Sequence, residues 1–145
     1  MGQMDALDPV SVMFACDRCG ANACTLTLLP PGAPDPQAPG PGAPGWMPGQ
    51  DTQFADGLRL SIDGPVPNTR VLFSGVPVAV LESAMRAADA PRLYALDNEY
   101  APQWCPDCAK NYCSSCWVIW VETDDGFYDC ARGRCPENHE RMIDD

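Results

Sequence analysis

The residues best suited to chemistry are the cysteines of one short stretch, CPDCAKNYCSSCW, from Cys105 to Trp117. They follow the spacing C-x2-C-x4-C-x2-C. Thiols at such spacings form disulfides, act in redox enzymes or bind metal ions. The chain has nine cysteines, an odd number that fits a simple disulfide framework badly, and in a reducing compartment such cysteines are more often metal ligands. The pattern therefore predicts metal binding.

Zinc is the metal that this pattern predicts, because structural zinc sites take four tetrahedral ligands, commonly supplied as two short-spaced pairs. The chain contains three C-x2-C pairs and one C-x3-H pair. The eight predicted ligands are Cys16, Cys19, Cys105, Cys108, Cys113, Cys116, Cys135 and His139. Eight ligands suffice for two closed sites, so the predicted cofactor is Zn²⁺, two ions per chain.

The simplest connectivity of these pairs is sequential. It predicts that the first two pairs hold one zinc ion and that the last two pairs hold the other. Two alternatives stay open: a cross-braced connectivity, in which alternate pairs share an ion, and a second site completed by Cys130 with Cys135, which leaves His139 free.

The two remaining cysteines have separate predictions. Cys24 lies in a segment of alternating polarity, where a thiol behaves as a small buried apolar residue. For Cys130, ordinary packing or an alternate ligand role is the favoured interpretation; the alternative is a reactive thiolate whose pKa is lowered by the following Arg132 and Arg134.

The elements that position these residues are short. A helix is predicted from Val78 to Ala90, because apolar residues recur there at helical spacing and Pro91 follows. A turn is predicted at Asp124 to Gly126. Extended segments, the middle two forming a hairpin, are predicted at Cys24–Leu28, Leu58–Asp63, Arg70–Ser74 and Trp117–Glu122.

Proline and glycine concentrate in one segment, residues 30–50, with eight of the 16 prolines and five of the 12 glycines. Such a composition predicts a disordered insert. The chain is then one zinc-binding domain over residues 12–145, with a hairpin-plus-helix insertion at 56–90 and a flexible N-terminus at 1–11. The predicted fold class is a small α+β zinc-stabilised domain, zinc-ribbon or treble-clef-like, with two zinc sites, short β-strands and one helix.

Charge and composition narrow the function classes. A formal net charge of −11 with a single lysine disfavours nucleic acid, because binding to the phosphate backbone requires Lys and Arg. No segment has the roughly 20 apolar residues of a membrane span, and the first fifteen residues lack a secretory pattern. We therefore expect a cytoplasmic protein without membrane contact. The sequence contains no catalytic constellation and favours a non-enzymatic role.

The stretch CPDCAKNYCSSC resembles the central part of zinc-binding domains of the in-between-RING and RING type, in which C-P-x-C is followed after four residues by C-x2-C. The resemblance covers Cys105 to Cys116 and implies a treble-clef-like fold with two sites filled in sequence. Because such domains occur in ubiquitin ligases, it also implies conjugating enzymes or ubiquitin-like proteins as partners. The whole chain is similar to small uncharacterised bacterial zinc-ribbon proteins. It departs from the RING-type pattern in the 85 residues between its first two pairs and in its C-x3-H pair.

These observations favour a structural double-zinc-binding module that mediates protein–protein interaction. The predicted contact surface surrounds the last two ligand pairs, Cys113 with Cys116 and Cys135 with His139. It presents Trp117, Trp120, Phe127 and Tyr128, since aromatic residues are typical interface anchors. Trp104, Trp117 and Trp120 are also predicted to shield the zinc turns. The alternatives are a thiol/zinc redox switch and a RING or in-between-RING-like component of a ubiquitin-like conjugation system.

Overall fold

The computed structural model describes residues 10–38 and 57–145. Residues 1–9 of the predicted flexible N-terminus (1–11) and residues 39–50 of the predicted Pro/Gly-rich insert lie outside these described residues, whereas Val10 and Ser11 begin strand β1 (Val10–Ala15). The division of the chain into a domain and its insertions stays a prediction.

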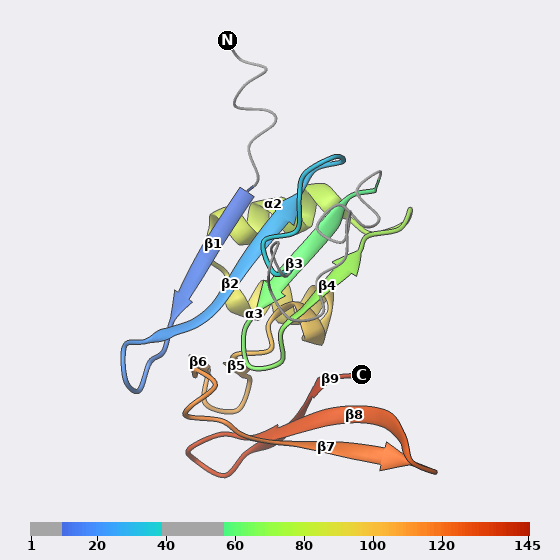
Figure 1. Cartoon of the computed structure of the whole chain (residues 1–145). Helices are drawn as coiled ribbons and strands as arrows, with labels where there is room; N and C mark the ends of the chain where they lie inside the picture. Colours follow the sequence, from blue (N-terminus) through green and yellow to red (C-terminus); the bar gives the residue numbers. More distant parts are fainter. Residues whose placement is uncertain (1–9, 39–56) are drawn as a thin grey trace.

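The first part of the fold is a four-stranded antiparallel sheet with the order β1-β2-β3-β4 (Figure 1). Its strands are β1 (Val10–Ala15), β2 (Asn22–Leu29), β3 (Arg59–Asp63) and β4 (Asn68–Val71). Strands β3 and β4 confirm the predicted hairpin. Strand β1 pairs with β2 across a turn that carries the first cysteine pair, so the sheet directly positions two predicted ligands.

Two helices, α2 (Val78–Arg86) and α3 (Ala90–Leu96), follow the sheet, and a 3-10 turn, η2 (Asn98–Tyr100), follows them. The sequence predicted one helix that ends before Pro91. Pro91 instead occupies the first turn of α3, where the missing N–H of proline costs nothing. The Asp89 carboxylate caps α3 by accepting the Arg92 N–H at 3.2 Å. In the described part of the chain, neither helix is long and apolar enough to cross a membrane.

The helices cover one face of the four-stranded sheet (Figure 1). Cross-strand partners place Leu26 opposite Ile62 and Leu28 opposite Leu60, so all four side chains share that face. Leu81, Met85 and Leu93 come from the helices, and all seven of these side chains are buried. The apolar stripe that predicts the helix therefore packs into the core.

Strand β3 also bonds to residues 30–38. The buried Arg59 guanidinium donates to the carbonyl of Pro30 at 3.3 Å and to that of Ala33. The Gln37 amide donates to Ser61 Oγ at 2.8 Å. Residues 30–38 are thus tied to the sheet by polar contacts.

The second part of the fold carries most of the predicted ligands. A small hairpin pairs β5 (Trp104–Cys105) with β6 (Lys110–Asn111). A three-stranded antiparallel sheet follows, with the order β7-β8-β9, built from β7 (Val118–Asp124), β8 (Phe127–Arg134) and β9 (Glu140–Asp144). The two-residue turn between β7 and β8 holds Asp125 and Gly126 at φ values of 50° and 83°. The predicted turn and the preceding strand are confirmed.

One arginine joins the two parts. Arg141 on β9 is buried, and its Nη1 donates to the carbonyls of Ala101 at 2.7 Å and Trp104 at 2.8 Å. Its Nη2 donates to the Asn98 carbonyl at 2.9 Å, and its guanidinium lies 5.1 Å from the centre of the Tyr94 ring. One side chain therefore holds β9 against the segment that leads from α3 to β5.

The predicted fold class is wrong. Within residues 10–38 and 57–145 the fold is mostly β, with 40% of these residues in strands and three antiparallel sheets, and it has two short helices rather than one. A zinc-ribbon or treble-clef-like α+β domain was predicted because the cysteine turns dominate the sequence pattern. Those turns occupy few residues, and the extended segments between them determine the architecture.

Candidate metal centres

Cysteine and histidine side chains meet in two groups of four. Cluster 1 contains Cys16, Cys19, Cys113 and Cys116, and cluster 2 contains Cys105, Cys108, Cys135 and His139. In each cluster, one ligand atom from every residue lies within 4.8 Å of all the others.

Cluster 1 forms where two turns meet. Cys16 and Cys19 lie on the turn between β1 and β2, and Cys113 and Cys116 lie between β6 and β7. The Sγ atoms of Cys16 and Cys116 are 3.7 Å apart, and those of Cys19 and Cys113 are 3.5 Å apart. The Sγ atoms of Cys113 and Cys116, which lie on the same turn, are 3.7 Å apart.

Cluster 2 joins the small hairpin to the C-terminal sheet. Cys105 and Cys108 lie at the β5–β6 hairpin, and Cys135 and His139 lie on the connection from β8 to β9. His139 Nδ1 lies 3.7 Å from Cys105 Sγ, 3.2 Å from Cys108 Sγ and 3.4 Å from Cys135 Sγ. The Cys108 and Cys135 Sγ atoms are 3.7 Å apart.

These separations fit tetrahedral coordination. With metal–sulfur bonds of about 2.3 Å, two thiolates of a tetrahedral site lie about 3.8 Å apart, and a thiolate and an imidazole nitrogen lie about 3.5 Å apart. The four sulfur–sulfur distances given above are 3.5 to 3.7 Å, and the three sulfur–nitrogen distances are 3.2 to 3.7 Å. These distances are those expected between donor atoms at the corners of a tetrahedron around one ion.

Local backbone conformation explains why these short sequences form ligand turns. Gly20 and Ala109 each follow the second cysteine of a pair, with positive φ values of 79° and 55°. Their N–H groups donate to the carbonyls of Cys16 at 2.9 Å and Cys105 at 2.8 Å, and so close each turn. Glycine tolerates this left-handed conformation easily, whereas Ala109 carries some strain.

The thiol pKa values show how crowded the two clusters are. Burial raises the pKa of Cys105 and of Cys116 to about 12, and neighbouring thiols add to the effect. Burial also acts to raise the pKa of Cys16, but backbone N–H groups of Cys113, Cys19 and Arg18 outweigh it and lower that pKa to about 6. Four thiolates cannot share such a space unless a cation offsets their repulsion, which is what a bound metal provides.

In cluster 2, backbone N–H groups stabilise the thiolate of Cys135, as they do that of Cys16 in cluster 1. The Cys135 Sγ accepts the backbone N–H groups of Glu137 at 3.3 Å and His139 at 3.4 Å. Burial acts to raise the pKa of Cys135, yet these backbone donors lower it overall. Donors aimed at sulfur stabilise the thiolate form, which is the form that binds metal.

The clusters combine alternate pairs along the chain. The first and third pairs meet in cluster 1 and the second and fourth in cluster 2, so the geometry follows the cross-braced alternative and departs from sequential pairing. The reason lies in the four-residue link from Ala109 to Tyr112, which contains strand β6. This link holds the second and third ligand pairs apart. The second pair therefore meets the β8–β9 connection, and the third pair meets the β1–β2 turn. That the eight residues bind metal stays a prediction.

Cys130 and Cys24 lie outside both clusters. Cys130 is opposite Glu122 in the β7–β8 ladder, so it does not replace His139 beside Cys135. Burial, Glu122 and Asp129 raise the pKa of Cys130 against the opposing effect of Arg132, which disfavours the alternative of a thiolate activated by arginine. Burial, with Asp63, raises the pKa of Cys24 to about 12, as befits a core thiol.

The tryptophans take different positions. Trp117 is buried, its indole N–H donates to the Gln103 carbonyl at 3.3 Å, and its ring meets Tyr112 edge to face at 6.1 Å. Trp104 and Trp120 are half-buried. Sequence reasoning missed Tyr112, whose position directly before Cys113 was an available signal. It also missed Arg141, for which the sequence pattern offers no signal.

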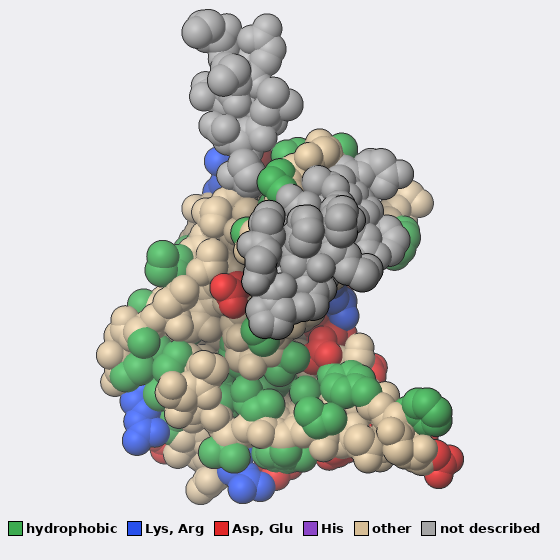
Figure 2. All heavy atoms as spheres, viewed as in Figure 1, with side chains coloured by type: hydrophobic (Ala, Val, Ile, Leu, Met, Phe, Trp, Pro, Cys, Tyr) green, Lys and Arg blue, Asp and Glu red, His purple; other side chains and the backbone are tan. Residues whose placement is uncertain are grey.

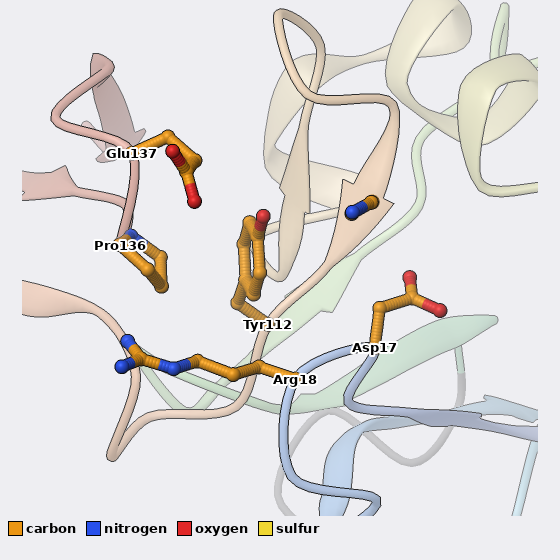
Figure 3. Close-up of a pocket in the computed structure, with 6 residues that line it drawn as sticks. Asp17, Arg18, Tyr112, Pro136 and Glu137 are labelled. Carbon is orange, nitrogen blue, oxygen red and sulfur yellow. The ribbon is translucent and has the colours of Figure 1, made fainter.

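A hollow of about 300 Å³ lies between the turns of the two clusters (Figure 3). Asp17 and Arg18 line it from cluster 1, and Pro136 and Glu137 line it from cluster 2. Lys110 and Tyr112 complete the lining from the chain between them. Asp17 fixes this arrangement, because its carboxylate accepts the Asn111 N–H at 2.7 Å and its own N–H donates to the Asn111 carbonyl at 2.7 Å. Arg18 and Lys110 place positive charge beside two groups of thiols.

The fold and its sites define a mostly-β protein with two cross-braced Cys/His clusters that can each hold a metal ion. The chain belongs to the family described as "Domain of unknown function (DUF8328)", whose model matches residues 7–145. No curated protein and no solved structure matches the chain.

Proposed function

We propose that the two clusters each bind one zinc ion and that the protein is a structural zinc module that binds another protein. The observation that carries the zinc proposal is the presence of two complete four-donor sets, in each of which all donor atoms lie within 4.8 Å of one another. Seven thiols and one imidazole suit zinc, whereas magnesium and calcium prefer oxygen ligands. Four protein donors also fill the coordination sphere, which is typical of structural rather than catalytic zinc.

The positions of the clusters support a structural role. Cluster 1 ties the turn between β1 and β2 to the start of β7, while cluster 2 ties β5 to the β8–β9 connection. The buried cluster cysteines, Cys16, Cys105, Cys113 and Cys135, pack in the same core as the sheet leucines. Metal in the two clusters would therefore connect all three sheets, two of which are small.

The proposed partner surface is the β7–β8 hairpin. Its two ends are adjacent to ligands of different clusters, because Cys116 lies just before β7 and Cys135 just after β8. Metal binding would hold the base of the hairpin and reduce the ordering cost of binding a partner. Phe127 is 77% exposed on this hairpin, whereas Trp117 is buried and drops out of the predicted surface.

Metal content and partner recovery test the two halves of this proposal. Elemental analysis of the native full chain should give two zinc ions per chain, and one ion or none would contradict the paired sites. Affinity purification should recover a partner with the intact chain and lose it with Phe127→Ala. The matched control is Phe73→Ala, because Phe73 is 75% exposed just beyond β4. Equal loss with both variants would reject the hairpin as the contact surface.

A further inference from the structure

The outer part of the β7–β8 hairpin is exposed on both faces. The nine consecutive residues Val121 to Asp129, here called the hairpin tip, are all exposed. Strand β9 pairs with β8 only as far as Ala131, so the tip is two strands wide. A two-stranded ribbon in water is marginally stable, and a third strand stabilises it.

The composition of the tip is both acidic and apolar. Its sequence VETDDGFYD contains four carboxylates and neither lysine nor arginine. Val121 is 57% exposed and Tyr128 is 51% exposed, and Phe127 is more exposed than either. Figure 2 shows hydrophobic and acidic side chains together at this end of the molecule, at the lower right.

A β-bulge concentrates the negative charge. The ladder pairs Glu122 with Cys130 and Thr123 with Tyr128, so Asp129 is the extra residue on β8. One donor atom from each of Glu122, Asp129 and Cys130 lies within 4.8 Å of the other two. Arg132 Nε offsets part of this charge from 3.7 Å away at Glu122. The remaining carboxylate charge is available to a cationic partner.

Strand β7 is also an edge. Among the described residues it pairs with β8 alone, so the backbone groups on its other side face outward. The strand has seven residues, and Val118 at its start is 62% exposed. A long edge strand with exposed apolar side chains can accept an extended segment by strand addition.

We propose that β7 binds an extended segment of a partner protein as an added strand, and that this segment alternates basic and apolar residues. The inference rests on the proposed function, since it names the chemistry of the partner. Lysine or arginine of the added strand would meet Glu122 and Asp124 on one face of β7, and apolar residues would cover Val121 on the opposite face. A second copy of this chain is a poor occupant, because two tips side by side would bring eight carboxylates together.

Model peptides test this inference with the zinc-loaded full chain. The probe is a fluorescently labelled peptide with blocked ends and the sequence KVKVKVK, and its anisotropy reports binding at low salt. One control peptide replaces every lysine with glutamate. The other carries N-methyl groups on two successive central residues, which blocks both hydrogen-bonding edges. Each control should bind at least about tenfold more weakly, since one loses the charge match and the other the backbone pairing.

Paired variants locate the binding site. Asp124→Asn with Asp129→Asn should weaken binding of KVKVKVK at least about tenfold. Asp63→Asn with Glu82→Gln removes the same charge far from β7 along the chain and should change binding less than about twofold. The inference would be overturned if KVKVKVK fails to bind, or if either control peptide binds equally well. It would also be overturned if both double variants have equal effects, or if light scattering shows dimerisation that depends on the tip.

The zinc content of the same sample separates the two proposals. A chain that lacks two zinc ions contradicts the structural zinc module itself. A chain that holds two zinc ions but does not discriminate among the peptides rejects strand addition alone.

Discussion

Substitution of cysteines in pairs distinguishes cross-braced from sequential connectivity. Cys16→Ser with Cys113→Ser removes two ligands from cluster 1 and leaves cluster 2 complete. Cys16→Ser with Cys105→Ser removes one ligand from each cluster. Under sequential pairing the roles reverse, because Cys16 and Cys105 would then share an ion.

The expected size of the effect follows from the affinity of structural zinc. A site contributes about 10 to 16 kcal/mol at neutral pH, so each of four equal ligands supplies about 2.5 to 4 kcal/mol. Loss of one ligand then weakens binding by about 70-fold to 900-fold. Loss of two leaves about 5 to 8 kcal/mol, which corresponds to a Kd between about 1 μM and 0.2 mM.

Competition with a chromophoric chelator of nanomolar affinity measures this difference. The Cys16/Cys113 variant should release one zinc ion at once and keep one at native affinity. The Cys16/Cys105 variant should show two ions of intermediate affinity and none at native affinity. The opposite assignment of these two titration profiles would refute the cross-braced connectivity.

Three further predictions concern folding. A strong chelator should abolish the near-UV circular dichroism of the chain, because two structural sites contribute more free energy than a small domain has to spare, and an unchanged spectrum would contradict this. Arg141→Met should lower the free energy of unfolding in urea by about 3 kcal/mol, since it removes the side-chain donor to four backbone carbonyls. The exposed Arg86→Met should lower it by less than about 1 kcal/mol, and equal effects of the two variants would be contrary evidence. Burial raises the pKa of Cys24 from its ordinary value of 9.0 to about 12, so the folded state keeps this proton at a higher pH than the unfolded state does. The free energy of unfolding should therefore fall as pH rises from about 9 to 12, by up to about 1.4 kcal/mol per pH unit. Cys24→Ala should show a shallower decline, and an identical slope would refute the assignment.

The cysteine pairs are predictable from sequence because each pair is local. A C-x2-C turn needs only two ligands and a residue such as Gly20 that accepts positive φ. Which pairs meet is a tertiary property, set here by strand β6 between Cys108 and Cys113. Spacing alone therefore favoured the sequential connectivity, and the structure groups the pairs alternately.

The fold class was harder to predict from the sequence, because it too depends on tertiary contacts. Strands such as β5 and β6 have two residues each and leave no periodic signal in the sequence. Pro91 has two structural meanings, since proline both follows helices and begins them, and the sequence does not distinguish these. From the sequence, Arg141 would be taken for an exposed cation. It is in fact buried, and it donates hydrogen bonds to backbone carbonyls that the sequence does not identify as its partners.

X-ray absorption spectroscopy of the native chain tests the central claim most directly, because it reports the metal, its ligands and their distances together. The two clusters predict zinc with seven sulfur ligands and one nitrogen ligand per two ions, at about 2.3 Å and about 2.0 Å. A spectrum dominated by oxygen ligands, or the absence of zinc from protein purified without chelator, would contradict two structural zinc centres.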